Sequence, residues 1–299
     1  MCGIVGLFLK DPILEPDLGR LLSQMMGVLS DRGPDSAGFA VFGRGETGNV
    51  KLTVRGAEGT DFLALARRLS ESLGVRIAAV GRHTHGILTL PADRETDAKA
   101  ALAKLAPEID LVGAGTRMEL YKEVGRPELV ATQFGLERML GTHGICHTRM
   151  ATESAVTTNG AHPFSTGLDQ CLVHNGSLSN HNAVRRELRR EGIEFATEND
   201  TEVAAGYLTA RMHKGASLKQ ALTDALTDLD GFYTFVVGTE SGFGVLRDPI
   251  ACKPAVMAET DRYVAFGSEY RALVDLPDIA KARIWEPEPS TVYFWERPN

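Results

Sequence analysis

The chain begins Met-Cys-Gly-Ile-Val-Gly, so a cysteine directly follows the initiating methionine. The apolar residues from Ile4 to Phe8 predict a first strand, which must start immediately beside that cysteine. If Met1 is removed, Cys2 carries both a thiol and a free α-amine, whose pKa is ordinarily about 7.7–8.0. Such an amine can act as the general base for its own thiol. The alternative is that Cys2 is simply an early residue of a buried strand.

Composition limits the classes of protein to which the chain can belong. Its 299 residues are 43% hydrophobic and 24% charged, which is typical of a globular protein with one large core or a core and a subdomain. The net charge of −7 argues against nucleic acid or an anionic membrane as a partner. No apolar run approaches the roughly 20 residues of a membrane span, and the run from Ile4 to Leu9 is too short for a signal peptide. We therefore expect a cytoplasmic protein.

The cysteine spacing argues against a metal or cofactor in this chain. The cysteines are scattered without a Cys-x-x-Cys pair, at Cys2, Cys146, Cys171 and Cys252. This spacing fits neither a disulfide framework nor a zinc or iron–sulfur site. His83 and His85 are two residues apart, so on a strand both would face one side, but no third ligand is evident nearby, and we expect no metal site there.

The order of the predicted elements indicates an α+β fold with a separate unit inside it. Within residues 43–141 the apolar pattern predicts strand, helix, strand, strand, helix and strand, which is the order of a ferredoxin-like unit. We therefore expect an inserted subdomain at about residues 44–140, ending in a helix over 130–140 that leads back to the main body. From Gly144 onward, short strands and runs of helices predict layers with largely antiparallel sheets. The tail, residues 284–295, predicts a closing strand or a hairpin.

His174-Asn175-Gly176 is a candidate for oxyanion stabilisation. It follows a strand predicted over residues 170–174 and is expected to open a loop before a helix. An asparagine side-chain amide and the following glycine N–H are suitable donors to an oxyanion, and glycine has no side chain to block their approach. The alternative is a simple turn, because Asn-Gly is a common turn dipeptide.

Arg149 and Asp200 are candidates for binding the two charged groups of a free amino acid. Arg149 ends a predicted strand and could bind a carboxylate through two hydrogen bonds, while Asp200 could bind an ammonium group. The alternatives are a surface charge at a strand end for Arg149 and a helix N-cap for Asp200. Two loops, Arg32–Ser36 and His162–Phe164, are candidate pocket walls or, alternatively, rigid turns.

Taken together, these segments resemble the class II, or N-terminal nucleophile, glutamine amidotransferase domain. The matching segments occur in the family's order: Cys2–Gly6, Arg32–Gly38, His147–Thr152, Ala161–Pro163, His174–Gly176 and Asp200–Glu202. The resemblance covers nearly all of residues 1–299 except the central insert, and it implies a four-layer αββα sandwich. The chain departs from the family in having Met150 in place of a tryptophan, Cys146 in place of a glycine, and a long insert.

The resemblance also implies a reaction and the residues that carry it. The Cys2 thiolate attacks the side-chain amide of L-glutamine, and Asn175 and Gly176 stabilise the oxyanion. Ammonia leaves, and water then hydrolyses the glutamyl thioester. Substrate-binding roles follow from the resemblance for Arg149, Asp200, Thr152, His162 and Arg32.

The resemblance further implies that another polypeptide uses the ammonia. The chain shows no synthetase P-loop, phosphosugar-binding or phosphoribosyltransferase segment. It looks most like the amidotransferase subunit of split glutamate synthase-like systems, which include N-methylglutamate synthase and in which a partner subunit carries FMN and an iron–sulfur cluster. Two alternatives are a self-sufficient γ-glutamyl amide hydrolase and a non-catalytic regulatory or scaffold subunit that retains the fold. The insert is our candidate for the element that docks on the partner.

Overall fold

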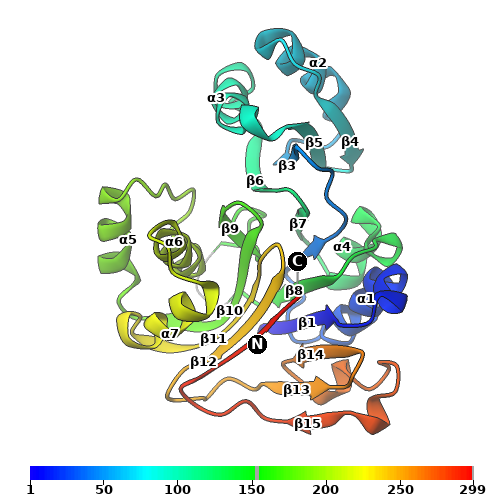
Figure 1. Ribbon diagram of the computed structural model, residues 1–299, viewed down its shortest axis with the longest axis vertical. Helices are drawn as coiled ribbons and strands as arrows, with labels where there is room; N and C mark the ends of the chain where they lie inside the picture. The colour runs from blue at the N-terminus through cyan, green and yellow to red at the C-terminus, as the bar shows by residue number, and fades with distance from the viewer. Residues whose placement is uncertain (152–154, 298–299) are drawn as a thin grey trace.

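The structure, a computed structural model, describes residues 1–151 and 155–297, and this part of the chain forms three antiparallel sheets. Two of the sheets form the main body, and the third projects from it (Figure 1). The seven-stranded sheet has the order β15-β13-β14-β1-β8-β2-β7, and the five-stranded sheet has the order β16-β12-β11-β10-β9. The four-stranded sheet has the order β4-β5-β3-β6.

The elements have the following bounds. The seven-stranded sheet contains β1 (Gly3–Leu9), β2 (Ser36–Phe42), β7 (Met118–Val124), β8 (His143–Arg149), β13 (Val256–Glu259), β14 (Tyr263–Gly267) and β15 (Arg283–Trp285). The five-stranded sheet contains β9 (Phe164–Gly167), β10 (Gln170–Leu178), β11 (Gly231–Gly238), β12 (Gly242–Arg247) and β16 (Thr291–Glu296). The four-stranded sheet contains β3 (Asn49–Arg55), β4 (Ala78–Arg82), β5 (His85–Pro91) and β6 (Asp110–Gly115). The helices are α1 (Leu18–Val28), α2 (Phe62–Leu73), α3 (Glu95–Leu105), α4 (Pro127–Phe134), α5 (His181–Arg190), α6 (Asp200–His213) and α7 (Leu218–Asp228).

The main body has four layers, in the order helix, sheet, sheet, helix. Helices α1 and α4 pack on the outer face of the seven-stranded sheet, and α5, α6 and α7 cover the outer face of the five-stranded sheet. Strand β1 shows the alternation that makes this possible, because Val5 and Leu7 join the core under α1. Ile4 and Phe8 point the other way and join Val173 of the second sheet in the core between the sheets. These layers confirm the αββα sandwich.

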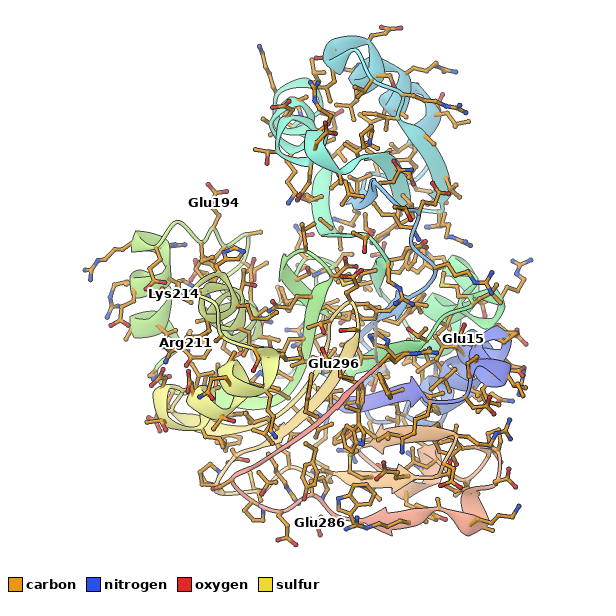
Figure 2. The ribbon with its side chains drawn as sticks, in the orientation of Figure 1. Glu15, Glu194, Arg211, Lys214, Glu286 and Glu296 are labelled. Atoms are coloured by element: carbon orange, nitrogen blue, oxygen red, sulfur yellow. The ribbon has the colours of Figure 1, made fainter. Side chains whose placement is uncertain are left out.

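The insert contains the projecting four-stranded sheet. Helices α2 and α3 pack against this sheet around an apolar core that includes Leu52, Leu65 and Leu102, and side chains fill the space between them (Figure 2). The strands and helices occur in the order expected for a ferredoxin-like unit. The separate sheet occupies only residues 49–115 of the expected 44–140, because β7 pairs with β2 and α4 packs with α1 in the main body.

Strand β7 was not expected from the sequence. Leu120 lies in the core between the sheets, and Tyr121 lies in the core under α1, so the strand is buried on both faces. Lys122 is also buried, and its charge together with that of Glu123 hides the apolar character of the strand in the sequence. The chain therefore returns to the main body earlier than residue 140.

The C-terminal segment links the two sheets of the main body. β15 pairs with β13 in the seven-stranded sheet, and β16 pairs with β12 in the five-stranded sheet. Between them, Glu286, labelled in Figure 2, accepts a hydrogen bond of 2.7 Å from Arg247. Of the two forms expected for residues 284–295, the hairpin is therefore wrong, because the two strands lie in different sheets.

Candidate active site

Cys2 lies at the start of β1, between the ends of two neighbouring strands. Gly3 pairs with Thr148 of β8, and on the other side Val5 pairs with Gly267 of β14. The Cys2 thiol is partly exposed, and its Sγ lies 3.7 Å from the carbonyl oxygen of Met150. Cys2 therefore lies at the edge of the sandwich, between the ends of β8 and β14.

Met1 is held loosely over this position. Its side chain and backbone are 70% exposed, and its α-amine donates a 3.0 Å hydrogen bond to the carbonyl oxygen of Arg32. The amine also lies 3.0 Å from the Met150 sulfur. Met1 is thus exposed beside Cys2, and its amine lies against Arg32 and Met150.

Two side chains, those of Arg32 and Ser268, bind the backbone next to the thiol, and Glu269 holds Arg32 in place. Arg32 donates from Nε to the Cys2 carbonyl oxygen at 3.1 Å and from Nη1 to Glu269 at 2.5 Å. The hydrogen bond from Arg32 is the largest cause that lowers the pKa of Glu269 below its usual value. Ser268 accepts a 2.9 Å hydrogen bond from the backbone N–H of Ile4. Arg32, expected in a pocket wall, thus binds the carbonyl oxygen of Cys2 itself. Sequence reasoning did not single out Ser268, which binds the next part of the strand, or Glu269, which holds Arg32.

Asn175 and Gly176 reach the same place from the second sheet. Asn175 Nδ2 lies 3.4 Å from the Cys2 carbonyl oxygen and 3.3 Å from Ser268 Oγ. The dipeptide does not open a loop as expected, because pairing with β11 continues through it as far as Leu178. Gly176 has φ +143°, and a Cβ there would lie 1.9 Å from the carbonyl oxygen of Phe232, so only glycine fits.

Arg149 is the last residue of β8, and the Arg32–Gly38 segment lies beside it. Its backbone bridges to Pro34, and its carbonyl oxygen accepts from the N–H of Asp35 at 3.1 Å. Asp35 in turn accepts from the N–H of Ala151 at 2.8 Å, which holds the segment just after β8. Arg149 is buried, so the alternative of a surface charge is wrong. Thr152 lies outside the described residues.

Asp200 is the first residue of α6, one position after the helix cap. Asn199 is the N-cap, and its side chain accepts from the N–H of Thr201, so the cap alternative for Asp200 is wrong. Asp200 accepts from the N–H of Leu178 at 2.9 Å and lies 3.7 Å from Nδ1 of His174. Burial opposes ionisation, but His174 and the Leu178 N–H outweigh it and lower the pKa of Asp200 to about 2. Asp200 is therefore a carboxylate suited to an ammonium group.

Three buried histidines lie behind these residues. The rings of His147 and His162 stack with centroids 4.0 Å apart. Thr201 Oγ1 contacts His162 Nε2 at 2.6 Å and His174 Nδ1 at 3.0 Å. Burial lowers the pKa of His147 to about 3 and that of His162 well below its usual value, so both are neutral at neutral pH. His162 thus contacts Thr201, the neighbour of Asp200, and the His147 ring, which in turn contacts Asn175.

Lys122 holds the loop that carries His162, and sequence reasoning missed it. Its Nζ is buried and donates to the carbonyl oxygens of Asn159, Ala161 and Pro163. Burial lowers the pKa of Lys122 to about 8. Its place in a strand that was not predicted explains why no sequence signal pointed to it.

Two further observations concern groups of possible metal ligands and the length of the apolar helices. Within residues 1–151 and 155–297, no three His, Cys, Asp or Glu side chains are grouped as a metal site would require. None of the helices in this part of the chain is both long and apolar enough to cross a bilayer.

Comparison with known proteins decides the family. The chain is 65% identical over 297 residues to the glutamine amidotransferase-like protein GlxB of Rhizobium meliloti (strain 1021), covering 99% of this chain and 98% of that protein. Residues 147–275 match a glutamine amidotransferase domain family. The chain belongs to the class II glutamine amidotransferase family. As a member of this family it is an enzyme that acts on the side-chain amide of glutamine.

More distant members share parts of the sequence or only the fold. The amidophosphoribosyltransferase of Synechocystis sp. (strain ATCC 27184 / PCC 6803 / Kazusa) is 35% identical over 159 residues, covering 50% of this chain and 32% of that protein. The solved glutamine phosphoribosylpyrophosphate amidotransferase from B. subtilis, complexed with ADP and GMP, superposes with a TM-score of 0.61 at 19% identity. That match covers 99% of this amidotransferase and 47% of the solved chain, and it shows a shared fold.

Proposed function

We propose that Cys2, with Met1 removed, is the nucleophile that hydrolyses L-glutamine, and that a synthase subunit bound to this chain uses the ammonia. The observation that carries the proposal is the position of the Asn175 side-chain amide, whose Nδ2 lies 3.4 Å from the Cys2 carbonyl oxygen. A donor in that position suits an oxyanion formed on a substrate that Cys2 has attacked. Met1 is exposed, which makes it accessible for removal.

In the proposed reaction, the α-amine of Cys2 takes the thiol proton, and the thiolate attacks the side-chain carbonyl carbon of glutamine. Asn175 Nδ2 and the Gly176 N–H donate hydrogen bonds to the tetrahedral oxyanion. The carbon–nitrogen bond then breaks, the α-ammonium gives its proton to the departing nitrogen, and ammonia leaves. Water hydrolyses the remaining thioester, which releases glutamate and restores the Cys2 thiol.

Arg149 and Asp200 are proposed to bind the α-carboxylate and the α-ammonium group of glutamine. Asp200 suits an ammonium because its low pKa keeps it ionised, and Arg149 suits a carboxylate because a guanidinium donates in a planar pair. Arg32 is proposed to act by holding the Cys2 carbonyl oxygen, and His162 by supporting the pocket from behind. A role for Thr152 follows from the family resemblance alone.

The proposed user of the ammonia is the synthase subunit of N-methylglutamate synthase or of a close glutamate synthase relative. Such a subunit would carry FMN and an iron–sulfur cluster, and this chain would carry no cofactor. The insert supports the proposal of a docked partner, because β4 lies at an edge of its sheet with Val80 57% exposed. Exposed edge strands are typical places for another chain to bind.

The nucleophile is tested with the purified chain. Glutamate release from glutamine is measured for the wild type, for Cys2→Ala and for Cys252→Ala, which removes another exposed thiol. Mass spectrometry of the N-terminus reports whether Met1 is absent. We expect turnover to vanish only in Cys2→Ala and Met1 to be missing from the active protein. Turnover that persists in Cys2→Ala would refute the proposed nucleophile.

The partner is tested with a tagged chain expressed in its native host. We expect a co-purifying protein that contains flavin and iron, measured by absorbance and metal analysis. Val80→Asp on the edge strand should abolish that association without changing glutaminase activity, whereas Leu129→Asp, at an exposed position of α4 in the main body, serves as the control. A chain that turns over glutamine freely and binds no flavoprotein would favour the self-sufficient hydrolase instead.

A further inference from the structure

The side-chain amide of Asn175 has two chemically different ends, and its neighbours decide which end faces Cys2. Nδ2 lies 3.4 Å from the Cys2 carbonyl oxygen and 3.3 Å from Ser268 Oγ. A carbonyl oxygen can only accept a hydrogen bond. A flipped amide would place two acceptor oxygens against each other in a buried setting, so the nitrogen end must face Cys2.

His147 contacts the opposite end of the same amide. Its Nε2 lies 3.2 Å from Asn175 Oδ1 and 3.2 Å from the carbonyl oxygen of His174. Both oxygens accept only, so Nε2 must carry the hydrogen. Within the described residues, His147 Nδ1 is buried without a hydrogen-bond partner, and a hydrogen there would be an unpaired buried donor. The contacts therefore select the tautomer of His147 that is protonated at Nε2.

The His147 ring is held in place by its surroundings. It projects from β8 in one sheet and bonds to Asn175 of β10 in the other, so the contact crosses between the sheets. The His162 ring stacks on it at 4.0 Å, and Lys122 fixes the backbone on both sides of His162. Burial also keeps the ring neutral, because the pKa of His147 is lowered to about 3. The ring can therefore neither rotate freely nor gain a second proton near neutral pH.

We propose that His147 is a positioning residue that orients the Asn175 amide, so that its N–H group faces the oxyanion formed during attack by Cys2. The inference rests on the proposed function of Cys2 and Asn175. His147 itself touches no reacting atom, and its effect passes entirely through the Asn175 side chain.

The kinetic consequence is specific. Without the His147 donor, only the long contacts of Nδ2 with the Cys2 carbonyl oxygen and Ser268 Oγ oppose rotation of the Asn175 amide, so its oxygen can turn toward the site more often. Loss of one oxyanion donor typically lowers kcat by about 10²–10³-fold. Since rotation leaves part of the population correctly oriented, we expect His147→Leu to lower kcat by roughly 10–100-fold, within that limit. KM should change little, because the oxyanion exists only in the transition state and the intermediate.

Two variants and one matched control test the role. His147→Gln places an amide donor near the former Nε2 position and should recover most of the kcat lost in His147→Leu. His143→Leu is the control, since His143 is buried on the same strand and bonds to the Thr239 carbonyl oxygen but not to Asn175. We expect His143→Leu to lower stability while leaving kcat unchanged. Equal kcat for His147→Leu and the wild type, or equal losses in His147→Leu and His143→Leu, would overturn the inference.

A second measurement needs no turnover. Nitrogen-15 NMR of the wild-type histidine side chains, with His147 assigned from the spectrum of His147→Gln, reports which ring nitrogen carries the proton. We expect Nε2 protonated and Nδ1 bare between pH 6 and 8. A proton on Nδ1 would sink the inference even if glutamine turnover is normal. If the chain proves to have no Cys2-dependent glutaminase, the proposed function fails on its own, and the tautomer still decides whether His147 orients the amide.

Discussion

The active site brings together three distant parts of the chain: Cys2 just before β1, Asn175 of the second sheet and Ser268 after β14. The inserted sheet, in contrast, draws its core from residues 50–114 alone. The core of the insert is a single apolar cluster. Around the site, by contrast, His147, His162 and His174 are buried polar groups with specific partners. The site thus depends on the whole sandwich being folded, while the insert depends mainly on its own local packing.

One glycine from each region shows how the surroundings of the backbone differ between the site and the insert. Gly176, at the site, has a positive φ, and its missing side chain is required by the carbonyl oxygen of Phe232. Gly59, before α2 of the insert, also has a positive φ of +83°, yet nothing lies within 4 Å of the position of a Cβ. Gly176 therefore combines a special backbone conformation with close packing, whereas Gly59 needs only the conformation.

The largest difference is expected between alanine substitutions at these two glycines. Gly59→Ala should cost about 1–2 kcal/mol, the usual penalty for a side chain in a left-handed conformation. Gly176→Ala adds a contact of 1.9 Å with backbone and should cost at least about 3 kcal/mol. Urea unfolding of both variants measures the costs. Similar losses of unfolding free energy in Gly176→Ala and Gly59→Ala would show that the β10–β11 pairing can shift to accommodate a side chain at Gly176.

Leucine truncations sharpen the comparison further. Leu52 of β3 and Leu172 of β10 are both fully buried, so each change to alanine should cost about 2–5 kcal/mol. Leu52→Ala should leave glutamine turnover unchanged, because its cluster shares no residue with the site. Leu172→Ala should lower turnover as well as stability, since β10 carries Asn175. Denaturation and steady-state kinetics on both variants test this, and a loss of turnover in Leu52→Ala would show that the insert and the site are coupled.

The same contrast explains what could be predicted from the sequence. The elements of the insert follow from local apolar spacing, and Cys2, Asn175 and Asp200 followed from short segments with recognisable chemistry. The position of Arg32 could not be predicted from the sequence, because its partner Glu269 lies 237 positions away in the chain. The conformation of Gly176 could not be predicted either, since the pairing of β10 through this residue depends on β11, which is distant in sequence.

Strand β7 shows a second physical reason for error. Its buried lysine satisfies its charge with three backbone carbonyl oxygens from the loop around His162. Lysine is rarely buried, so the sequence pattern of Lys122 favours an exposed segment. Only the folded loop makes that burial favourable, and no local pattern contains the information.

Acid should destabilise the main body through its buried histidines. Burial lowers the pKa of His143 to about 3, whereas the unfolded chain has an ordinary histidine pKa of about 6.5. As the pH falls below about 6.5, the unfolded chain binds a proton on this histidine, whereas the folded chain does not. The free energy of unfolding therefore decreases as the pH falls. Between pH 7 and pH 5 the loss from one such histidine is about 2 kcal/mol. His143→Gln should remove this part of the pH dependence, measured by urea unfolding at the two pH values. If His143→Gln lost as much unfolding free energy between pH 7 and pH 5 as the wild type, His143 would not be the group that titrates.

The smallest effect is expected at an exposed ion pair of the insert. Arg55 and Asp110 lie 3.2 Å apart on neighbouring strands, and their side chains are 27% and 46% exposed. Because water screens such a pair, Asp110→Asn should cost less than about 1 kcal/mol and leave turnover unchanged. Arg32 and Glu269 form the matched pair at the site, where Arg32 is only 11% exposed and also holds the Cys2 carbonyl oxygen. Glu269→Gln should therefore lower turnover even if its effect on stability is equally small. If both substitutions left turnover unchanged, the ion pair beside Cys2 would be no more functional than the one on the insert, and the orientation of the nucleophile would have to come from Ser268 and the strand itself.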